Sequence, residues 1–262
     1  PPGSTVVVLA DPFSFPAEDV ARAVSGGANG VTVVGAMASA GGGPGGNLLV
    51  ADGRVVTSGA VGLMLPPGVG VTPIVSQGCR PIGEPLVVTR SSGNLIEEIA
   101  GQPALDRLLA QVDAASPDDR RSMARAQLVG IALDERKVDL EPSDFLVRSI
   151  LGADKARRAV AVDHEVAIGS IVQFQVRDAA SADADLRDLL ADAGGDAALV
   201  FPDVGKGTAL HGHPHHDASV VHQHLEGGAV AGMFAAGEIA PLGGRHIAHV
   251  GATCVLLFDD PF

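Results

Sequence analysis

The chain contains no tryptophan and no tyrosine, and its eight phenylalanines make aromatic residues only 3% of the composition. Its core must therefore be built from Val, Ala, Leu and Ile, small side chains that favour sheets and close helix–sheet packing. Cysteine is nearly absent as well, and Cys79 and Cys254 lie too far apart in the sequence for a CxxC centre. We expect both to be free thiols in a reducing cytoplasm.

Basic residues and long apolar runs are also scarce. The 18 Lys and Arg residues are outnumbered by 31 Asp and Glu, which gives a net charge of −13. The basic residues are scattered, so neither nucleic acid nor an anionic membrane is an expected partner. No apolar run approaches the roughly 20 residues of a membrane-spanning helix, and the start of the chain lacks a secretory pattern. These features predict a soluble, cytoplasmic protein.

Hydrophobic residues, glycine and proline are plentiful. Hydrophobic residues make up 46% of the chain, with 34 Gly and 17 Pro, which predicts an ordered protein of many short elements joined by tight turns. The first part of the chain predicts a strand at 5–10, a helix from Pro16 to about Ser25 and a strand at 31–37. Asp52–Gly53 predicts a hairpin turn soon afterwards.

Helix signals mark the middle of the chain. Pro103 opens a helix with one apolar face, and Ser116 is a predicted N-cap with Pro117 at the first helical position. The junction between these two helices, at 113–116, is the expected boundary between two lobes. Further strands are predicted at 127–133, 145–151, 159–162, 171–177 and 197–201.

A weak internal similarity links the two halves of the chain. The order strand, proline-bearing turn, helix, strand and Gly-rich turn begins at Leu9 and again at Leu199. It predicts two related lobes with a crevice between their Gly-rich turns. The expected fold class is α/β in the mixed α+β sense, each lobe a mixed, largely antiparallel sheet flanked by helices.

The most informative stretch of the sequence is Gly232–Arg245, GMFAAGEIAPLGGR. It places Glu238 and Arg245 among four glycines, between apolar runs at Ala229–Ala235 and His249–Phe258 that predict strands. Glycine at this density lets a ligand come close to main-chain N–H groups. The stretch therefore predicts a ligand-binding connection, and the simpler alternative is a tight turn with a surface ion pair.

This stretch resembles the signature near the end of the FIST proteins, a family of intracellular sensory modules. Further segments match in the family's order: LADPFSFP at Leu9–Pro16, VVGAMASAG at Val33–Gly41, VSQGCRPIG at Val75–Gly83, DFLVRSILG at Asp144–Gly152 and VQFQVRDA at Val172–Ala179. The resemblance implies an N-type lobe over 1–112 and a C-type lobe over 113–262. Because the family usually has more chain ahead of the first motif, the N-type lobe is expected to be incomplete, with a missing N-terminal segment that packs on residues 1–112.

The resemblance implies a sensory protein that binds a small carboxylate, such as an amino acid, between its lobes and passes the signal to a protein partner. No catalytic residue is predicted, although an enzyme stays open as an alternative. The expected ligand residues are Arg80, Gly237, Glu238, Gly243, Arg245 and Lys206. The two arginines would neutralise the anion in bidentate fashion, and Glu238 would receive an amine or orient Arg245. For Arg80, pairing with a protein carboxylate is the alternative, while Cys79 and Cys254 are expected to pack as small hydrophobes.

Two glycine-containing loops could suggest phosphate binding. The G-x-G-x-x-G pattern at Gly41–Gly46 leads into a strand and not a helix, so it does not predict a dinucleotide site. The segment 204–208 lies between a strand and a helix, where Lys206 and backbone N–H groups could hold an anion. Members of the FIST family often carry Cys-Asn-Gly-Arg-Gly here; this chain lacks the Cys and Asn, which argues against a thiol-dependent role.

Six of the nine histidines lie between His211 and His224. Neutral imidazoles bind transition metals and haem iron, so the alternative function is a haem- or metal-binding sensor or enzyme that uses this loop. His215 and His216, at the expected start of a helix, are the predicted metal ligands. The simpler interpretations are an exposed loop with adventitious metal affinity, or an interaction scaffold that binds no small ligand.

Overall fold

The computed structural model describes residues 1–27 and 30–259. The chain divides into two compact units: unit 1 combines Pro1–Gly78 with the segment from Asp183 onward, and unit 2 is Cys79–Ala182. Unit 2 is therefore an insertion in the sequence of unit 1. Both units consist of mostly antiparallel sheets with flanking helices, which confirms the predicted mixed α+β class.

The first sheet of unit 1 has the strand order β18-β17-β2-β1-β5. Its members are β1 (Thr5–Ala10), β2 (Thr32–Ala38), β5 (Ala60–Leu65), β17 (Ala235–Leu242) and β18 (Arg245–His249). The parallel strands β1 and β2 are joined by α1 (Ala17–Gly26), so the predicted strand–helix–strand unit is confirmed. The predicted hairpin also forms, between β3 (Leu49–Ala51) and β4 (Arg54–Val56), with Asp52 and Gly53 at φ of 51° and 72°.

The second sheet of unit 1 has the order β16-β15-β19-β6. Its members are β6 (Val71–Ser76), β15 (Ala197–Pro202), β16 (Ala229–Gly232) and β19 (Thr253–Phe258). The connection between the parallel strands β15 and β16 contains η2 (Val204–Lys206), α5 (Thr208–His211) and α6 (His216–His224). The helix α4 (Ala179–Ala191) precedes β15. The Asp185 carboxylate of α4 accepts hydrogen bonds from the Ser76 hydroxyl at 2.7 Å and the Gly78 N–H at 2.8 Å.

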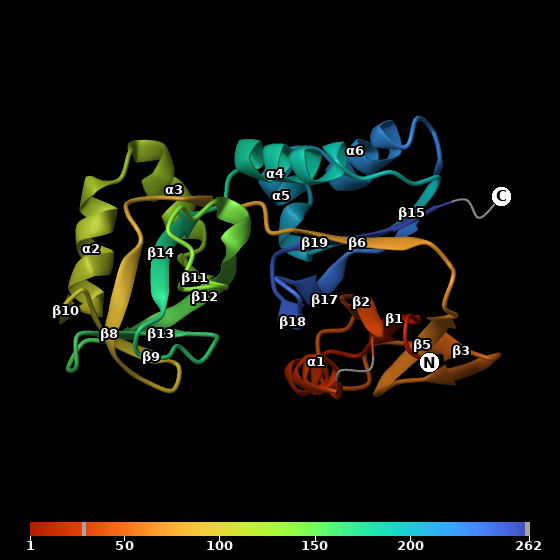
Figure 1. Cartoon of the computed structure of the whole chain (residues 1–262), viewed down its shortest axis with the longest axis horizontal. Coiled ribbons are helices and arrows are strands. Elements are labelled where there is room, and N and C mark those ends of the chain that lie inside the picture. The colour runs from red at the N-terminus through yellow and green to blue at the C-terminus, as the bar shows by residue number, and fades with distance from the viewer. Residues whose placement is uncertain (28–29, 260–262) are drawn as a thin grey trace. The chain divides into compact units, whose positions relative to one another are not determined.

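Unit 1 is a four-layer α–β–β–α arrangement. Val34 of the first sheet packs in one apolar cluster with Cys254 and Leu256 of the second, so the two sheets face each other. The outer face of the second sheet is covered by apolar side chains of α4 and α6, among them Leu186 and Val221. The outer face of the first sheet is covered by α1. Figure 1 shows α4 and α6 along β6 and β19, and α1 beside β1 and β2.

The internal similarity of the sequence corresponds to two parallel strand pairs that both lie in unit 1. In the first pair Gly35 of β2 is opposite Val8 of β1, and in the second Gly232 of β16 is opposite Val200 of β15. A Cβ atom at Gly35 or Gly232 would lie 1.9 Å or 1.8 Å from the facing valine carbonyl oxygen. Only glycine permits this backbone approach, so both positions follow from the same packing requirement.

Unit 2 is built around a closed ring of six strands. The ring consists of β8 (Leu86–Ser92), β9 (Leu95–Ile99), β13 (Ala159–Val162), β12 (Phe145–Asp154), β11 (Leu128–Ala132) and β14 (Ile171–Val176). Each strand pairs antiparallel with the next, and β8 closes the ring by pairing with both β14 and β9. The short strands β7 (Arg80–Pro81) and β10 (Gln102–Pro103) extend it, and η1 (Pro142–Asp144) precedes β12.

Two helices complete the core of unit 2. Leu108 of α2 (Ala104–Ala114) and Met123 of α3 (Pro117–Arg125) join Val160 and Phe174 of the ring in one apolar cluster. The predicted start of α3 is confirmed, because the Ser116 hydroxyl accepts a hydrogen bond from the Asp119 N–H at 3.1 Å. Among the described residues, no helix is both long enough and apolar enough to span a membrane.

The prediction of a Gly-rich connection over Gly232–Arg245 is wrong. Most of this stretch is β17, which pairs with β2 and continues through a turn at Gly243–Gly244 into β18. The strand includes Gly237 and Pro241, two residue types that sequence patterns count against a strand. Pairing on both sides, with β2 and β18, outweighs these local preferences.

Candidate functional site

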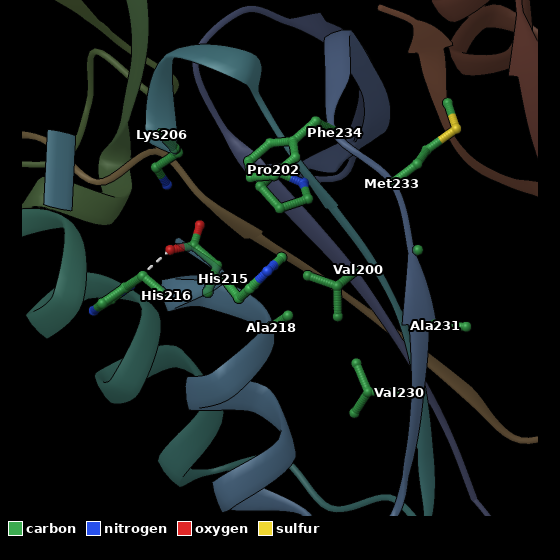
Figure 2. Close-up of a pocket in the computed structure, with 12 residues that line it drawn as sticks. Val200, Pro202, Lys206, His215, His216, Ala218, Val230, Ala231, Met233 and Phe234 are labelled. Carbon is green, nitrogen blue, oxygen red and sulfur yellow. Dashed lines mark hydrogen bonds and ion pairs between the residues drawn. The ribbon is translucent and has the colours of Figure 1, made fainter. Parts of the chain in front are cut away.

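A pocket of about 290 Å³ lies in unit 1, where the parallel strands β15 and β16 end and α6 begins. Ligands in open parallel sheets bind at this carboxyl edge of the strands. The pocket is lined by Val200, Pro202, Lys206, His215, His216, Asp217, Ala218, Val230, Ala231, Gly232, Met233 and Phe234. Figure 2 shows Lys206 and His216 toward one end of this set, and Val230 and Ala231 on the strand that faces α6. The pocket is thus polar at one end and largely apolar elsewhere.

The turn after β15 places Lys206 at the pocket. Asp203 caps η2: one carboxylate oxygen accepts from the Gly205 N–H at 2.7 Å, and the other accepts from the Gly251 N–H at 3.0 Å. Lys206 is the last residue of η2, and only 2% of its surface is exposed to solvent. Its ammonium donates a hydrogen bond to the Ser76 carbonyl at 3.1 Å. A buried lysine at the edge of a cavity is an unusual placement, because burying a charged group is costly unless it is partnered.

The start of α6 brings a histidine between two carboxylates. His216 Nδ1 lies 2.8 Å from Oδ1 of Asp217, and its Nε2 lies 2.9 Å from Oδ1 of Asp183 in α4. Asp217 is 4% exposed, and its other oxygen accepts a hydrogen bond from the Thr253 hydroxyl. The His211 ring stacks on that of His216, with centroids 3.7 Å apart and planes at 4°. The Nε2 atom of His211 lies 3.4 Å from the same Asp217 Oδ1.

Burial, together with the nearby positive groups, favours a neutral His211. Burial lowers the pKa of His211 below its ordinary value, and the nearby His216, Lys206 and His213 act in the same direction against the opposing effect of Asp217. The hydrogen bond from Arg187 lowers the pKa of Asp183, as does the contact with His216, so Asp183 is ionised over a wide pH range. Neutral imidazole nitrogens and carboxylate oxygens form a donor set that binds cations.

The structure brings together part of the predicted site. Lys206, His215 and His216 all line the pocket. His216 also belongs to a group of three possible metal ligands, with His211 and Asp217, whose donor atoms all lie within 4.8 Å of one another. His215 is not in that group; it occupies the position before α6 with φ of 61°. Asp217 was not predicted as a partner of these histidines, although it directly follows His216 in the chain.

Glu238 and Arg245 do not form the expected pair. Glu238 is fully buried in β17, opposite His249, whereas Arg245 is exposed at the start of β18, opposite Leu242. Four register positions separate them, which corresponds to about 13 Å along the strands. The conformations of Gly237 and Gly243, with φ of 146° and 57°, belong to the same hairpin. None of these four predicted ligand residues lines the pocket.

Arg80 belongs to unit 2 and pairs with protein carboxylates. Its guanidinium contacts Asp119 of α3, and its Nε lies 3.1 Å from Asp178, just after β14. Pairing with a protein carboxylate is the alternative expected for Arg80 from the sequence. The two cysteines are buried and form no disulfide, as expected. Burial raises the pKa of the Cys254 thiol, and the charge of Glu238 raises it further against the opposing effect of Lys206.

Comparison with known proteins assigns the chain to a family. The model of the FIST N domain matches residues 1–102, and that of the FIST C domain matches residues 104–241. An N domain is thus present, which corrects the expectation that only its C-terminal part would be found.

An uncharacterized protein of Mycobacterium bovis is 41% identical over 260 residues, 97% of this chain and 67% of the relative. An uncharacterized protein of Mycobacterium tuberculosis is 40% identical over 260 residues, 97% of this chain and 68% of the relative. The chain therefore belongs to the FIST family, whose domains are generally small-ligand sensory and signal-transduction modules.

Proposed function

We propose that this protein is a sensor that binds a small carboxylate, such as an amino acid, in the pocket of unit 1. The observation that carries the proposal is the buried ammonium of Lys206 at the polar end of a cavity of about 290 Å³. An ammonium in a site of low dielectric forms a strong charge-assisted hydrogen bond with a carboxylate. The volume is near the lower limit for ligand pockets, about 300 Å³, so the ligand must be small.

The first turn of α6 adds a second attraction for an anion. His215, the residue before the helix, makes no side-chain hydrogen bond to the helix start. The first N–H groups of an uncapped helix lack partners within the helix, and the macrodipole is positive at this end. Residues 215–218 line the pocket, so the first turn faces the same cavity as Lys206. The carboxylate would bind at this end, with the rest of the ligand toward the apolar walls.

The pocket also offers a route from binding to signalling. Met233 and Phe234 line it and connect β16 of one sheet to β17 of the other. A ligand that contacts this connection would stabilise one arrangement of the two sheets and shift the population toward it. A protein partner would recognise the favoured arrangement. Of the six predicted ligand residues, only Lys206 takes part in this proposal. The roles of the other five stay predictions: Arg80, Gly237, Glu238, Gly243 and Arg245.

Titration calorimetry with acetate, alanine, leucine and glutamate tests the proposal on chelator-treated protein. Lys206→Met keeps the length of the side chain and removes its charge. A hydrogen bond to a charged group is worth about 1.5–3 kcal/mol, so we expect this variant to bind the best carboxylate about 10- to 150-fold more weakly. Lys155→Met, at an exposed turn of unit 2, is the matched control and should bind as the wild type does.

Two results would overturn the proposal: no carboxylate binds to the wild type, or Lys206→Met binds as tightly as the wild type. Far-UV circular dichroism checks that each variant is folded. If Lys206→Met does not fold, Ala218→Leu gives a second test, because it narrows the pocket without changing any charge. We expect Ala218→Leu to weaken binding of leucine more than that of acetate.

A further inference from the structure

The two ring nitrogens of His216 have the same kind of partner. A neutral imidazole has one N–H and one lone pair. Both nitrogens of His216 have a carboxylate oxygen within hydrogen-bond distance, Asp183 at 2.9 Å and Asp217 at 2.8 Å. With a neutral ring, one contact would set a nitrogen lone pair against a carboxylate. A cation bound at one of the two nitrogens resolves this conflict.

His211 favours the bound cation. Its side chain is 2% exposed, and its Nε2 atom is buried without a hydrogen-bond partner, 3.4 Å from Asp217 Oδ1. Buried polar atoms nearly always have a partner, so an exception calls for an explanation. One metal ion shared by the two rings and Asp217 would satisfy all three groups.

We infer that His211, His216 and Asp217 bind one divalent transition metal ion of the Zn²⁺ class. Two imidazole nitrogens and one carboxylate oxygen are ligands that such ions prefer. Zn²⁺ bonds of about 2.0–2.1 Å in tetrahedral geometry place ligand atoms about 3.3–3.4 Å apart. The His211–Asp217 distance of 3.4 Å already matches. The His216–Asp217 distance must widen by about half an ångström, and the parallel rings must tilt as their nitrogens turn toward the ion.

The surroundings of the three ligands fit a metal site. Asp183 would accept the Nε2 proton of His216, which leaves Nδ1 for the metal, and Asp183 is itself held by Arg187 at 2.9 Å. The Thr253 hydroxyl donates to one oxygen of Asp217 and leaves the other facing the histidines. Carboxylates and hydroxyls in these positions orient metal ligands and strengthen binding.

The remaining histidines of this segment provide controls. His222 Nδ1 lies 3.1 Å from the Gly228 carbonyl, and His224 Nε2 lies 2.7 Å from the Ala193 carbonyl. Neither belongs to the three-ligand group found among the described residues. His222 is exposed on the same helix as His216, so His222→Ala reports adventitious metal binding. The fourth coordination position is free for water or for a ligand of the pocket, which His216 and Asp217 also line.

Zn²⁺ affinity measured against a chromophoric chelator tests the inference on the tag-free protein without added carboxylate. We expect one Zn²⁺ per chain and an affinity loss of more than about 100-fold in His211→Ala, because it removes a direct ligand. Asp183→Asn removes only the outer hydrogen bond and should lower the affinity about 10- to 100-fold. His222→Ala should stay within twofold of the wild type. The inference is overturned if the wild type binds no stoichiometric Zn²⁺, or if His222→Ala loses as much affinity as His211→Ala.

Cobalt substitution gives a readout that needs no variant. Co²⁺ bound by two imidazoles and a carboxylate in four-coordinate geometry is expected to give strong visible absorption, and addition of Zn²⁺ should bleach it. A spectrum like that of hydrated Co²⁺ would overturn the inference even if His211→Ala failed to fold. Lys206→Met should bind Zn²⁺ at least as tightly as the wild type, because it removes a nearby positive charge and no metal ligand. Metal binding and carboxylate binding can therefore fail separately.

Discussion

Arg80 joins three parts of unit 2 by contacting Asp119 in α3 and Asp178 after β14. The hydrogen bond from Arg80 is the largest cause that holds the pKa of Asp119 below its ordinary value. A carboxyl with a lowered pKa in the folded state stabilises the protein above its unfolded pKa, about 3.9, and this stabilisation is lost as the pH falls through the folded pKa.

We therefore expect Arg80→Met to lower the free energy of unfolding at pH 7, with a difference from the wild type that shrinks as the pH falls below about 4. Urea unfolding followed by far-UV circular dichroism between pH 3 and pH 7 measures this difference. Arg157→Met is the control. Arg157 is exposed, and its Nε atom lies 3.8 Å from the Asp154 carboxylate, which is too far for a hydrogen bond. A difference that stays constant with pH would show that Arg80 acts through packing and not through its carboxylate partners.

Single residues of the candidate site were predictable only where the neighbouring residues in the sequence indicated them. Lys206 follows a strand in a Gly-rich turn, and His216 stands at a helix start, so local patterns indicated both. Asp183 lies in α4, 33 residues before His216, and meets it only because α4 and α6 cover the same face of one sheet. Nothing in the local sequence around Asp183 indicates this contact.

The helix α3 begins at a cap that can be tested directly. The Ser116 hydroxyl accepts from the Asp119 N–H and donates to the Asp119 carboxylate at 2.8 Å. Replacement of such a cap by alanine usually costs about 1 kcal/mol, so we expect Ser116→Ala to lower the free energy of unfolding by this amount. Ser122→Ala, in the same helix but away from its start, should change it by less than about 0.5 kcal/mol. Urea unfolding distinguishes the two, and equal effects would contradict the capping role.

Elements with strong local signals were predicted, whereas β17, which has no such signal, was not. The hairpin at Asp52–Gly53 and the start of α3 depend on residues a few positions apart. The strand β17 depends on β2, whose paired residue Gly35 precedes Ile239 by about 200 positions in the chain. Its alanines, glycine and proline carry no strand preference of their own, so only the partner strands define it.

Across the whole molecule, the two parallel strand pairs of unit 1 share one packing requirement. Gly35 and Gly232 each leave no room for a Cβ atom beside the facing carbonyl. We expect Gly35→Ala and Gly232→Ala each to destabilise unit 1 by more than about 4 kcal/mol, because the clash is with backbone that cannot move aside. Gly26→Ala is the control, since nothing lies within 4 Å of its Cβ position. The chain has no Trp or Tyr, so thermal unfolding is best followed by far-UV circular dichroism. A melting temperature unchanged in either variant would contradict this packing.

The insertion of unit 2 between Gly78 and Asp183 constrains how a nascent chain folds on the ribosome. The strand β6 ends at Ser76, but its partner β19 begins only at Thr253. At synthesis rates of about 5–20 residues per second, β6 waits roughly ten seconds or longer for that partner. The ring of unit 2 uses only strands within 86–176 and closes first. During the wait, β2 and β6 present unpaired edges, the kind of surface that aggregates or recruits chaperones. Slower translation after residue 182 would prolong that exposure without changing the sequence of the finished protein.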